Sequence, residues 1–318
     1  MKHGADSAGH VPLGAGGEFD IVRAMLERWG PLATGIGDDA ALVQLPGIQL
    51  VVSTDTSVED VHFRTAWLTH REIGYRATAA ALSDLAAMAA MPIGVFLALT
   101  LPGADVAQAG EIADGVGECL AAADARVLGG DVSRGGSLSL TLTVMGTTSH
   151  PLTRGGARPG DRLYVTGRLG GPAAALREFQ AGRVPAPVFR DRFCHPVPRL
   201  KESRWLADHG ARAAIDISDG LVADARHLAA ASRAMLHVSG EKIPLCDSVS
   251  LEDALAGGEE YELLLACPDA LDAAAFEREF DLALTEIGDV SGEGEPGVEV
   301  TVDGRRVESP AGYDHFEE

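Results

Sequence analysis

The chain is poor in cysteine and lysine, and it lacks the common nucleotide-binding motifs. Its 318 residues include four cysteines (Cys119, Cys194, Cys246 and Cys267), with no CxxC pair and no spacing typical of a metal site. So few cysteines in a chain of this length predict a reduced, cytoplasmic protein. None of the three lysines lies in a GxxxxGK[ST] loop, and the HRD and DFG motifs of protein kinases are missing. These absences exclude P-loop proteins and protein kinases.

Long apolar runs and net positive charge are absent as well. The alanine-rich stretch 77–91 is interrupted by Ser83 and Asp84, so no segment has the pattern of a membrane span. The glycine-rich start lacks the apolar run of a signal peptide, and we expect 1–16 to be a disordered tail. The net charge of -21 argues against nucleic acid and anionic lipid as partners. An acidic protein that binds phosphates needs a cation between the two, such as a divalent metal.

Helix-like and strand-like patterns alternate along the chain, which predicts an α/β fold with two lobes. Glycine and proline are concentrated between 149 and 161, and this predicts a boundary between a domain of residues 17–149 and a domain of residues 150–318. Helices are expected over 17–29, 69–90, 106–123, 171–181, 200–209, 221–232 and 270–280, with a proline-broken linker before 198. Strands are expected over 48–54, 93–101, 126–128, 137–147, 162–166, 213–217, 235–238, 261–266 and 284–287.

Acidic residues of the first half follow glycines or an expected strand end. The sequence GIGDDA at 35–40 predicts a tight turn that presents Asp39. Asp55 is expected at the end of a strand, where α/β folds bind ligands. Ser53 and Thr54 would add hydroxyl and carbonyl oxygens around a hard cation. Each motif taken alone is as compatible with a solvated turn.

Two further aspartates lie in unusual surroundings. Asp84 occurs in a helix made largely of alanine, with only Arg76, two turns earlier, to neutralise it. A buried unpaired carboxylate is costly, so Asp84 should be exposed, paired or bound to metal, and we favour metal. Asp131 follows Gly129 and Gly130 at the end of a short expected strand. The glycine N–H groups would bind phosphate there, and Asp131 would bind its metal.

The second half repeats this arrangement in the sequence DISDG. Asp216 ends an apolar strand, and Ser218 and Asp219 precede a helix, where either would also serve as its cap. In GGEEYE, Glu259 and Glu260 would contact a substrate cation or ring nitrogen, although a charged hairpin tip is the alternative. The closing GYDHF predicts a terminus that folds back onto the protein.

Taken together, these aspartates predict a multi-metal site. Carboxylates gathered in one place repel one another unless cations lie between them. Hard oxygen ligands without a histidine and cysteine set favour Mg²⁺ over Zn²⁺. Mg²⁺ held by a few carboxylates and by phosphates is the usual arrangement for phosphoryl transfer from ATP. Arg154 and Arg168, near the glycines of the boundary, are the candidates for cationic contact with phosphate.

The ordered set of motifs resembles the thiamine-monophosphate kinase family over residues 17–316. It comprises GIGDDAA, STDTSVEDVHF, ALSDLAAMAAMP, GGD, LTRGGARPGD, DISDGL, GGEEYELL and GYDHF. The wider superfamily includes aminoimidazole ribonucleotide synthetase, selenophosphate synthetase and the hydrogenase-maturation dehydratase. The resemblance implies an N-terminal α/β lobe whose strands pair across a homodimer, a C-terminal α/β lobe, and ATP in the groove between them.

The resemblance also implies residue roles. The implied Mg²⁺ ligands are Asp39, Ser53, Thr54, Asp55, Asp84, Asp131, Asp216 and Asp219, and the implied ATP contacts are Gly130, Asp131, Arg154 and Ser218. The implied substrate contacts are His62, Glu259, Glu260 and Tyr313. The family usually has aspartate where this chain has Glu260, which leaves open which of the two glutamates makes the contact. Whether a monovalent cation is needed also stays open, and residues 1–16 have no counterpart.

The implied reaction is phosphorylation of thiamine monophosphate by ATP to give thiamine diphosphate. A phosphate oxygen is already anionic near neutral pH, so no general base is required and none is assigned. Another ATP-using member of the superfamily is the first alternative. Against it, no cysteine precedes Cys119, where the selenophosphate enzyme would need one, and the chain ends in Glu317-Glu318 instead of the reactive cysteine of the dehydratase. A non-catalytic nucleotide-binding or metal-binding protein is the second alternative.

Overall fold

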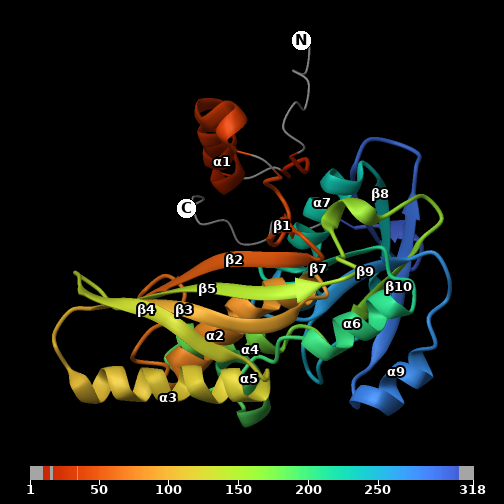
Figure 1. Cartoon of the computed structure of the whole chain (residues 1–318). Coiled ribbons are helices and arrows are strands. Elements are labelled where there is room, and N and C mark those ends of the chain that lie inside the picture. The colour runs from red at the N-terminus through yellow and green to blue at the C-terminus, as the bar shows by residue number, and fades with distance from the viewer. Residues whose placement is uncertain (1–9, 15–16, 34, 308–318) are drawn as a thin grey trace.

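The computed structural model describes residues 10–14, 17–33 and 35–307, which form two lobes built on one β-sheet each (Figure 1). The N-terminal sheet has five strands in the order β1-β2-β5-β3-β4. They are β1 (Ala41–Leu45), β2 (Ile48–Val58), β3 (Met91–Leu101), β4 (Arg126–Arg134) and β5 (Ser139–Thr148). The helices of this lobe are α1 (Gly17–Trp29), α2 (His70–Ala87) and α3 (Val106–Ala122), and a 3₁₀ turn, η1 (Gly30–Leu32), follows α1. The expected α/β class is confirmed.

Helices α2 and α3 cover one face of the five-stranded sheet (Figure 1). Helix α2 begins with a capping box in which Thr69 and Glu72 satisfy each other's backbone N–H groups. The two helices approach closely because glycine lies at their contact. A Cβ at Gly115 would lie 1.9 Å from the carbonyl oxygen of Arg71, and a Cβ at Gly74 would lie 2.2 Å from that of Ile112. The small residues of α2 therefore allow tight helix packing.

Strand alternation decides which side chains of β2 face α2. Asp55 is paired with Leu142 of β5, and Leu142 is only 1% exposed because it packs in the core beneath the helices. Asp55 therefore faces the helices, and so does Ser53, two residues earlier on the same strand. Thr54 and Thr56 face the opposite side of the sheet. We call that side the open face, because α2 and α3 do not cover it.

The C-terminal lobe has a seven-stranded sheet in the order β12-β11-β8-β10-β6-β9-β7. Its strands are β6 (Arg162–Thr166), β7 (Ala213–Asp216), β8 (Met235–Ser239), β9 (Leu263–Cys267), β10 (Leu284–Ser291), β11 (Gly297–Val302) and β12 (Arg305–Arg306). Its helices are α4 (Gly171–Gln180), α5 (Pro187–Cys194), α6 (Leu200–Asp208), α7 (Leu221–Ser232), α8 (Leu251–Ala256) and α9 (Ala273–Phe280), with 3₁₀ turns η2 (Arg154–Gly156) and η3 (Gly240–Lys242). Among the described strands of this sheet, β8 and β11 are the one pair that runs parallel.

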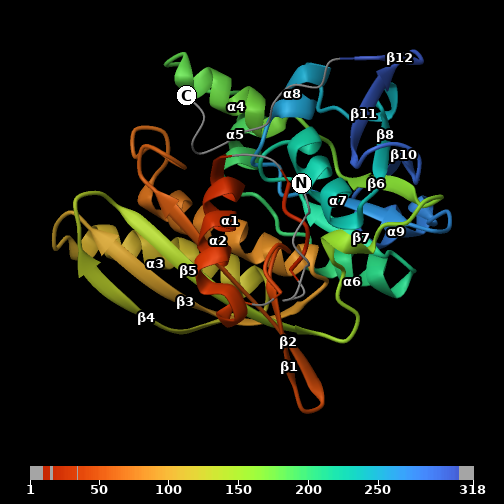
Figure 2. The ribbon, with the colours of Figure 1, turned by 90° about the horizontal axis from the view of Figure 1, so that it is seen from above.

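The hydrophobic core continues from one lobe into the other. Leu82 of α2, Phe193 of α5 and Leu206 of α6 belong to the same buried cluster. Figure 2 shows the lobes side by side, with α2 running toward the second lobe. Among the residues described, no helix combines the length and the apolarity that a membrane crossing requires.

Several elements differ from the sequence-based expectations. Strand β2 continues past Asp55 to Val58, and β4 continues through Gly129 and Gly130 to Arg134, so neither motif ends its strand. Gly130 is required by close strand contact, because a Cβ there would lie 1.9 Å from the carbonyl oxygen of Leu97. Helix α5 occupies the supposed linker, since Pro187 is at its first position, where proline is favourable. Strands β1, β11 and β12 and helix α8 were also not expected.

Candidate functional site

A cavity of about 710 Å³ is lined by residues of both lobes. We call it the interlobe cavity. Its N-lobe wall comes from β2, the segment after it and α2, and its C-lobe wall comes from α4, α5 and the two loops at 216–219 and 256–261. One part of the wall is acidic, with Asp55, Asp84, Asp216 and Asp219. Another part is apolar, with Val61, Trp67, Leu176 and Phe193.

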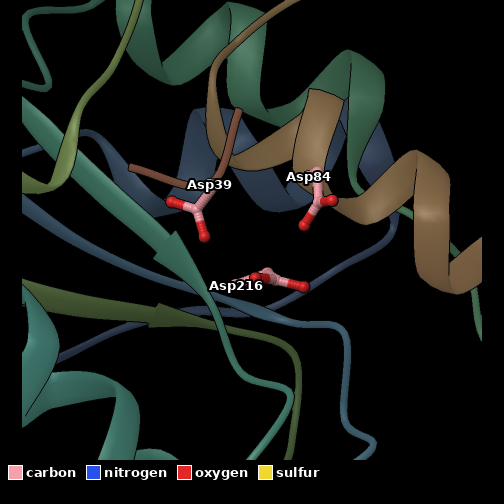
Figure 3. Close-up of side chains that lie close together, drawn as sticks. All are labelled: Asp39, Asp84 and Asp216. Atoms are coloured by element: carbon pink, nitrogen blue, oxygen red, sulfur yellow. The ribbon is translucent and has the colours of Figure 1, made fainter. Parts of the chain in front are cut away.

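Three carboxylates converge at the acidic end of the cavity, where Asp84 and Asp216 line the wall and Asp39 lies next to them without lining it. Asp39 precedes β1, Asp84 lies in the last turn of α2, and Asp216 ends β7. One oxygen of each lies within 4.8 Å of the others, and Figure 3 shows the three side chains directed toward a common space. We call these residues the acidic cluster. Its members come from both lobes, Asp39 and Asp84 from the first and Asp216 from the second.

Hydrogen bonds fix the orientation of each carboxylate in the acidic cluster. The Ser53 hydroxyl donates to Oδ2 of Asp84 at 2.5 Å, and the Ser83 hydroxyl donates to Oδ2 of Asp216 at 2.6 Å. The Arg154 guanidinium donates to both oxygens of Asp39, from Nε at 3.1 Å and from Nη2 at 2.5 Å. Arg154 therefore orients an acidic-cluster carboxylate and is not among the described residues that line the cavity.

The acidic cluster is electrostatically strained without a cation. Burial, and next the charge of Asp39, raise the pKa of Asp216 to about 7. Burial, and next the charge of Asp216, raise the pKa of Asp84 well above its ordinary value. A cation among the three carboxylates would offset both effects. The donor set consists of carboxylate and hydroxyl oxygens, which fits Mg²⁺ or another hard divalent cation.

Other expected site residues lie around the cavity. Asp55, Asp219, Ser218 and His62 all line it. The His62 ring accepts a hydrogen bond at Nδ1 from the backbone N–H of Val58, at 3.1 Å. Thr54 also lines the cavity, but its hydroxyl is on the open face, 2.9 Å from the hydroxyl of Thr143.

Gly130 and Asp131 lie apart from the acidic cluster in the described chain. Gly130 is in register with Asp55 across β3 and β5, three strand spacings or about 14 Å away. Asp131 is exposed and in register with Ala98, Thr141 and Thr56, so its side chain is on the open face and Asp55 is on the helix face. Arg168, the other cationic candidate, is exposed and pairs with Asp247 at 3.5 Å.

The two adjacent glutamates point in different directions. Glu259 lines the cavity and forms an ion pair with Arg76. Glu260 is 4% exposed and turns into the C-lobe, where its carboxylate accepts from the backbone N–H of Gly170 and from Nη2 of Arg192. Of the two, Glu259 faces the cavity and Glu260 does not. Tyr313 lies outside the described residues.

Two residues near the site were not identified from the sequence. Asp224 of α7 is 2% exposed, and its Oδ2 accepts from the backbone N–H groups of Ser218, Asp219 and Gly220 at 3.0 to 3.1 Å. An acid in the first turn of the helix after DISDG was the available signal. In the sequence Arg76 is only a distant partner for Asp84, because its contact with Glu259 joins segments far apart in the chain.

Comparison with known proteins places the chain in a family. Residues 37–148 match the AIR synthase related protein, N-terminal domain, and residues 158–301 match the AIR synthase related protein, C-terminal domain. The thiamine-monophosphate kinase of Escherichia coli K12 is 37% identical, with 94% of this chain and 98% of that protein covered. The thiamine-monophosphate kinase of Haemophilus influenzae is 33% identical, with 95% and 98% covered.

Solved structures agree with the sequence comparison. The structure of AaThiL complexed with AMPPCP and TMP is 31% identical, with a TM-score of 0.83 and with 94% of this chain and 97% of that chain covered. Thiamine-monophosphate kinase from Stenotrophomonas maltophilia is 35% identical, with a TM-score of 0.76 and coverage of 91% and 96%. The chain therefore belongs to the thiamine-monophosphate kinase family.

Proposed function

We propose that this protein transfers the γ-phosphoryl group of ATP to the phosphate of thiamine monophosphate, giving ADP and thiamine diphosphate. The observation that carries the proposal is the acidic cluster at one end of the interlobe cavity. The cavity combines carboxylates for metal-bound phosphates with an apolar wall for an organic ring system. Family membership at 37% identity over nearly the whole chain supports the same activity.

The proposed metal ligands are Asp39, Asp84 and Asp216, with Asp55 and Asp219 as further ligands on the cavity wall. Mg²⁺ bound there would neutralise charge on the transferred phosphoryl group and hold ATP for in-line attack. The chain's own residues orient these carboxylates. Ser53, Ser83 and Arg154 hold the acidic cluster, and Asp224 holds the backbone of Ser218 and Asp219, for which we propose contact with ATP and metal.

No side chain is assigned as a general base, because the attacking phosphate oxygen of the substrate is already ionised. His62 lines the cavity, and we propose that it contacts thiamine monophosphate. Val61, Trp67 and Phe193 would cover the rings of the substrate and exclude water. Glu259, and not Glu260, is the proposed acidic contact with the thiamine end. Tyr313 stays part of the proposal as a second contact there, and so does an optional monovalent cation.

We propose further that the protein is a homodimer and that Asp131 and Gly130 serve the site of the partner subunit. Exposed apolar side chains occur on four strands of the N-terminal sheet, and the strand register places five of them on the open face: Val43, Leu45, Ile48, Met91 and Phe96. A surface of this kind typically marks a protein interface. Pairing two sheets would bury it and would bring exposed Asp131 of one subunit toward the other subunit.

Three smaller predictions are kept as proposals. The lobes are proposed to divide at residues 149 and 150, between β5 and β6. The four cysteines are free, which supports the cytoplasmic location expected from their number. For residues 1–16 disorder remains a prediction, but Val11, in the described part, donates from its backbone N–H to the carbonyl oxygen of Ile36 at 2.9 Å.

One assay tests the activity. The purified chain is incubated with ATP, Mg²⁺ and thiamine monophosphate, and thiamine diphosphate and ADP are quantified. Equal amounts of the two products are expected. No thiamine diphosphate, but turnover of an aminoimidazole precursor, would assign the protein to another reaction of the superfamily. ATP binding without any turnover would indicate a non-catalytic binding protein.

A further inference from the structure

Glu259 presents its two carboxylate oxygens in different surroundings. Oε2 lies 2.6 Å from Nη2 of Arg76 and accepts the hydroxyl hydrogen of Tyr261 at an oxygen–oxygen distance of 2.5 Å. Oε1 has no hydrogen-bond donor among the residues that the structure describes. Because Glu259 lines the interlobe cavity, Oε1 is the oxygen available to a ligand. We call Arg76 and Tyr261 the Glu259 clamp.

The two residues of the Glu259 clamp are themselves held firmly. Arg76 is 5% exposed, its Nη1 donates to the carbonyl oxygen of Phe193 at 2.7 Å, and its guanidinium lies 4.1 Å from the centre of the Phe193 ring. Tyr261 is 8% exposed. Because the Arg76 guanidinium and the Tyr261 hydroxyl are fixed in place, both hydrogen bonds to Oε2 form in only one position of the Glu259 side chain.

The backbone around Glu259 is strained and held in place by its neighbours. Glu259 and Tyr261 have φ values of 66° and 53°, in the left-handed region that is costly for such side chains. The backbone N–H of Glu259 donates to the carbonyl oxygen of Ser218 at 2.7 Å, and that of Tyr261 donates to Ile217 at 2.9 Å. The buried carboxylate of Glu260 holds the segment from the other side. Strain maintained in this way is typical of a functional loop.

The position of the Glu259 clamp along α2 indicates which part of a ligand it meets. Arg76, Ala80 and Asp84 line the cavity at intervals of four residues on one face of α2. Arg76 is thus about 12 Å from Asp84 along the helix axis. If the phosphates bind at the acidic cluster, the Glu259 carboxylate, which contacts Arg76, is offset from them along α2, and we assign it to the end of the substrate that carries the aminopyrimidine ring.

We propose that Arg76 and Tyr261 are positioning residues, which hold Oε2 of Glu259 so that Oε1 accepts a hydrogen bond from the amino group of the substrate's pyrimidine. This inference rests on the proposed function and adds a specificity determinant to it. A carboxylate oxygen with no other donor discriminates an amino group from a carbonyl oxygen at the same ring position, because the carbonyl has no hydrogen to donate and repels the carboxylate.

The test compares Tyr261→Phe with Tyr164→Phe. Each change removes one hydroxyl group from a buried ring in the C-lobe, and each hydroxyl lies near a glutamate, Glu259 in one case and Glu286 at 3.3 Å in the other. Tyr164 is not among the residues that line the cavity. Binding of thiamine monophosphate, and of the analogue with a carbonyl oxygen in place of the amino group, is measured by calorimetry without ATP.

We expect the wild type to bind the amino compound at least about tenfold more tightly than the carbonyl analogue. Tyr261→Phe should weaken binding of the amino compound about three- to tenfold and should reduce the discrimination. In turnover assays, the KM for thiamine monophosphate should rise while kcat and the KM for ATP stay near wild type. Tyr164→Phe should match the wild type in every one of these measurements.

Three results would overturn the proposal. They are equal behaviour of the two variants, full discrimination retained by Tyr261→Phe, and no discrimination by the wild type. As a second variant, Arg76→Lys keeps the charge but shortens the reach to Oε2, and it should lose discrimination as Tyr261→Phe does. Because binding is measured without ATP, a wild type that binds the substrate and never phosphorylates it would contradict the proposed function and still leave the comparison of variants decisive.

Discussion

Ser83 of α2 donates a 2.6 Å hydrogen bond to Asp216, so a residue of the N-terminal lobe orients a carboxylate of the C-terminal lobe. The adjacent residue, Asp84, contributes its own carboxylate to the same cluster. One turn of one helix therefore both supplies and aligns ligands for the proposed metal site. This arrangement makes the acidic cluster sensitive to single substitutions, and the first prediction uses it.

Replacing Asp84 with asparagine should lower kcat by on the order of 100-fold or more, because an amide is a poor substitute for a carboxylate ligand of Mg²⁺. The fold should persist, since the change removes one of three mutually repelling charges and keeps the size of the side chain. Steady-state kinetics and circular dichroism measure the two effects. The matched control is Asp114→Asn, which changes an exposed aspartate of α3 and should leave activity unchanged. Near-normal rates for Asp84→Asn at ordinary Mg²⁺ would contradict the metal-site proposal.

The acidic cluster should make stability depend on pH and Mg²⁺ together. The pKa of Asp216 in the folded protein is about 7, above its ordinary 3.8, so the folded state binds this proton more tightly than the unfolded state. Its contribution to stability is complete below about pH 4 and is lost as the pH rises through about 7. Without divalent cations, Asp216→Asn should therefore raise the melting temperature relative to wild type at pH 8 but not at pH 5.

Added Mg²⁺ should restore the stability that is lost when the carboxylates of the acidic cluster ionise. The increase in melting temperature caused by Mg²⁺ should be larger at pH 8 than at pH 5 for the wild type, because the carboxylates must lose their protons to bind the metal. Thermal unfolding at both pH values, with Mg²⁺ or with a chelator, measures this increase in melting temperature. An equal Mg²⁺ effect in wild type and in Asp216→Asn would show that the ion binds elsewhere.

Asp224 should matter for activity beyond its effect on stability. Asp224→Ala removes the acceptor of three backbone N–H groups, which should cost about 1–3 kcal/mol of stability. It should also lower kcat/KM for ATP about 10- to 100-fold, because Ser218 and Asp219 lose their fixed positions. Asp105→Ala is the comparison, since Asp105 accepts from two backbone N–H groups at the start of α3, away from the site. It should cost about 1 kcal/mol and leave the kinetics intact. Similar kinetics for both variants would reduce Asp224 to a structural residue.

The proposed contribution of Asp131 to the partner's site can be tested by mixing inactive variants. Asp84→Asn and Asp131→Asn should each be inactive alone. After subunit exchange, random pairing makes half of the dimers mixed, and each mixed dimer has one site with both aspartates intact, so about a quarter of wild-type activity should return. No recovery, with subunit exchange verified by mass spectrometry, would place Asp131 and Asp84 in the same subunit's site or remove Asp131 from the site.

Local patterns in the sequence predicted the fold class and the convergence of Asp39, Asp84 and Asp216. Alternation and helical periodicity locate elements, and residues at element ends tend to meet at sheet edges. The extent of β4 could not be predicted in this way. Its glycines resemble a phosphate-binding turn, and only the structure shows that Gly130 is required for contact with β3. The distinction between Glu259 and Glu260 also needed the structure, because it depends on Arg76 and Arg192, which are far away in the chain.

Two of the three acidic-cluster carboxylates belong to the first lobe and the third belongs to the second. Neither lobe alone would therefore contain the complete acidic cluster that we propose as the metal site. If the chain were cut between β5 and β6 and the two fragments were expressed together, activity would return only in the fraction that reassembles. The chain would then serve as a split enzyme whose product reports the association of any two proteins fused to its halves.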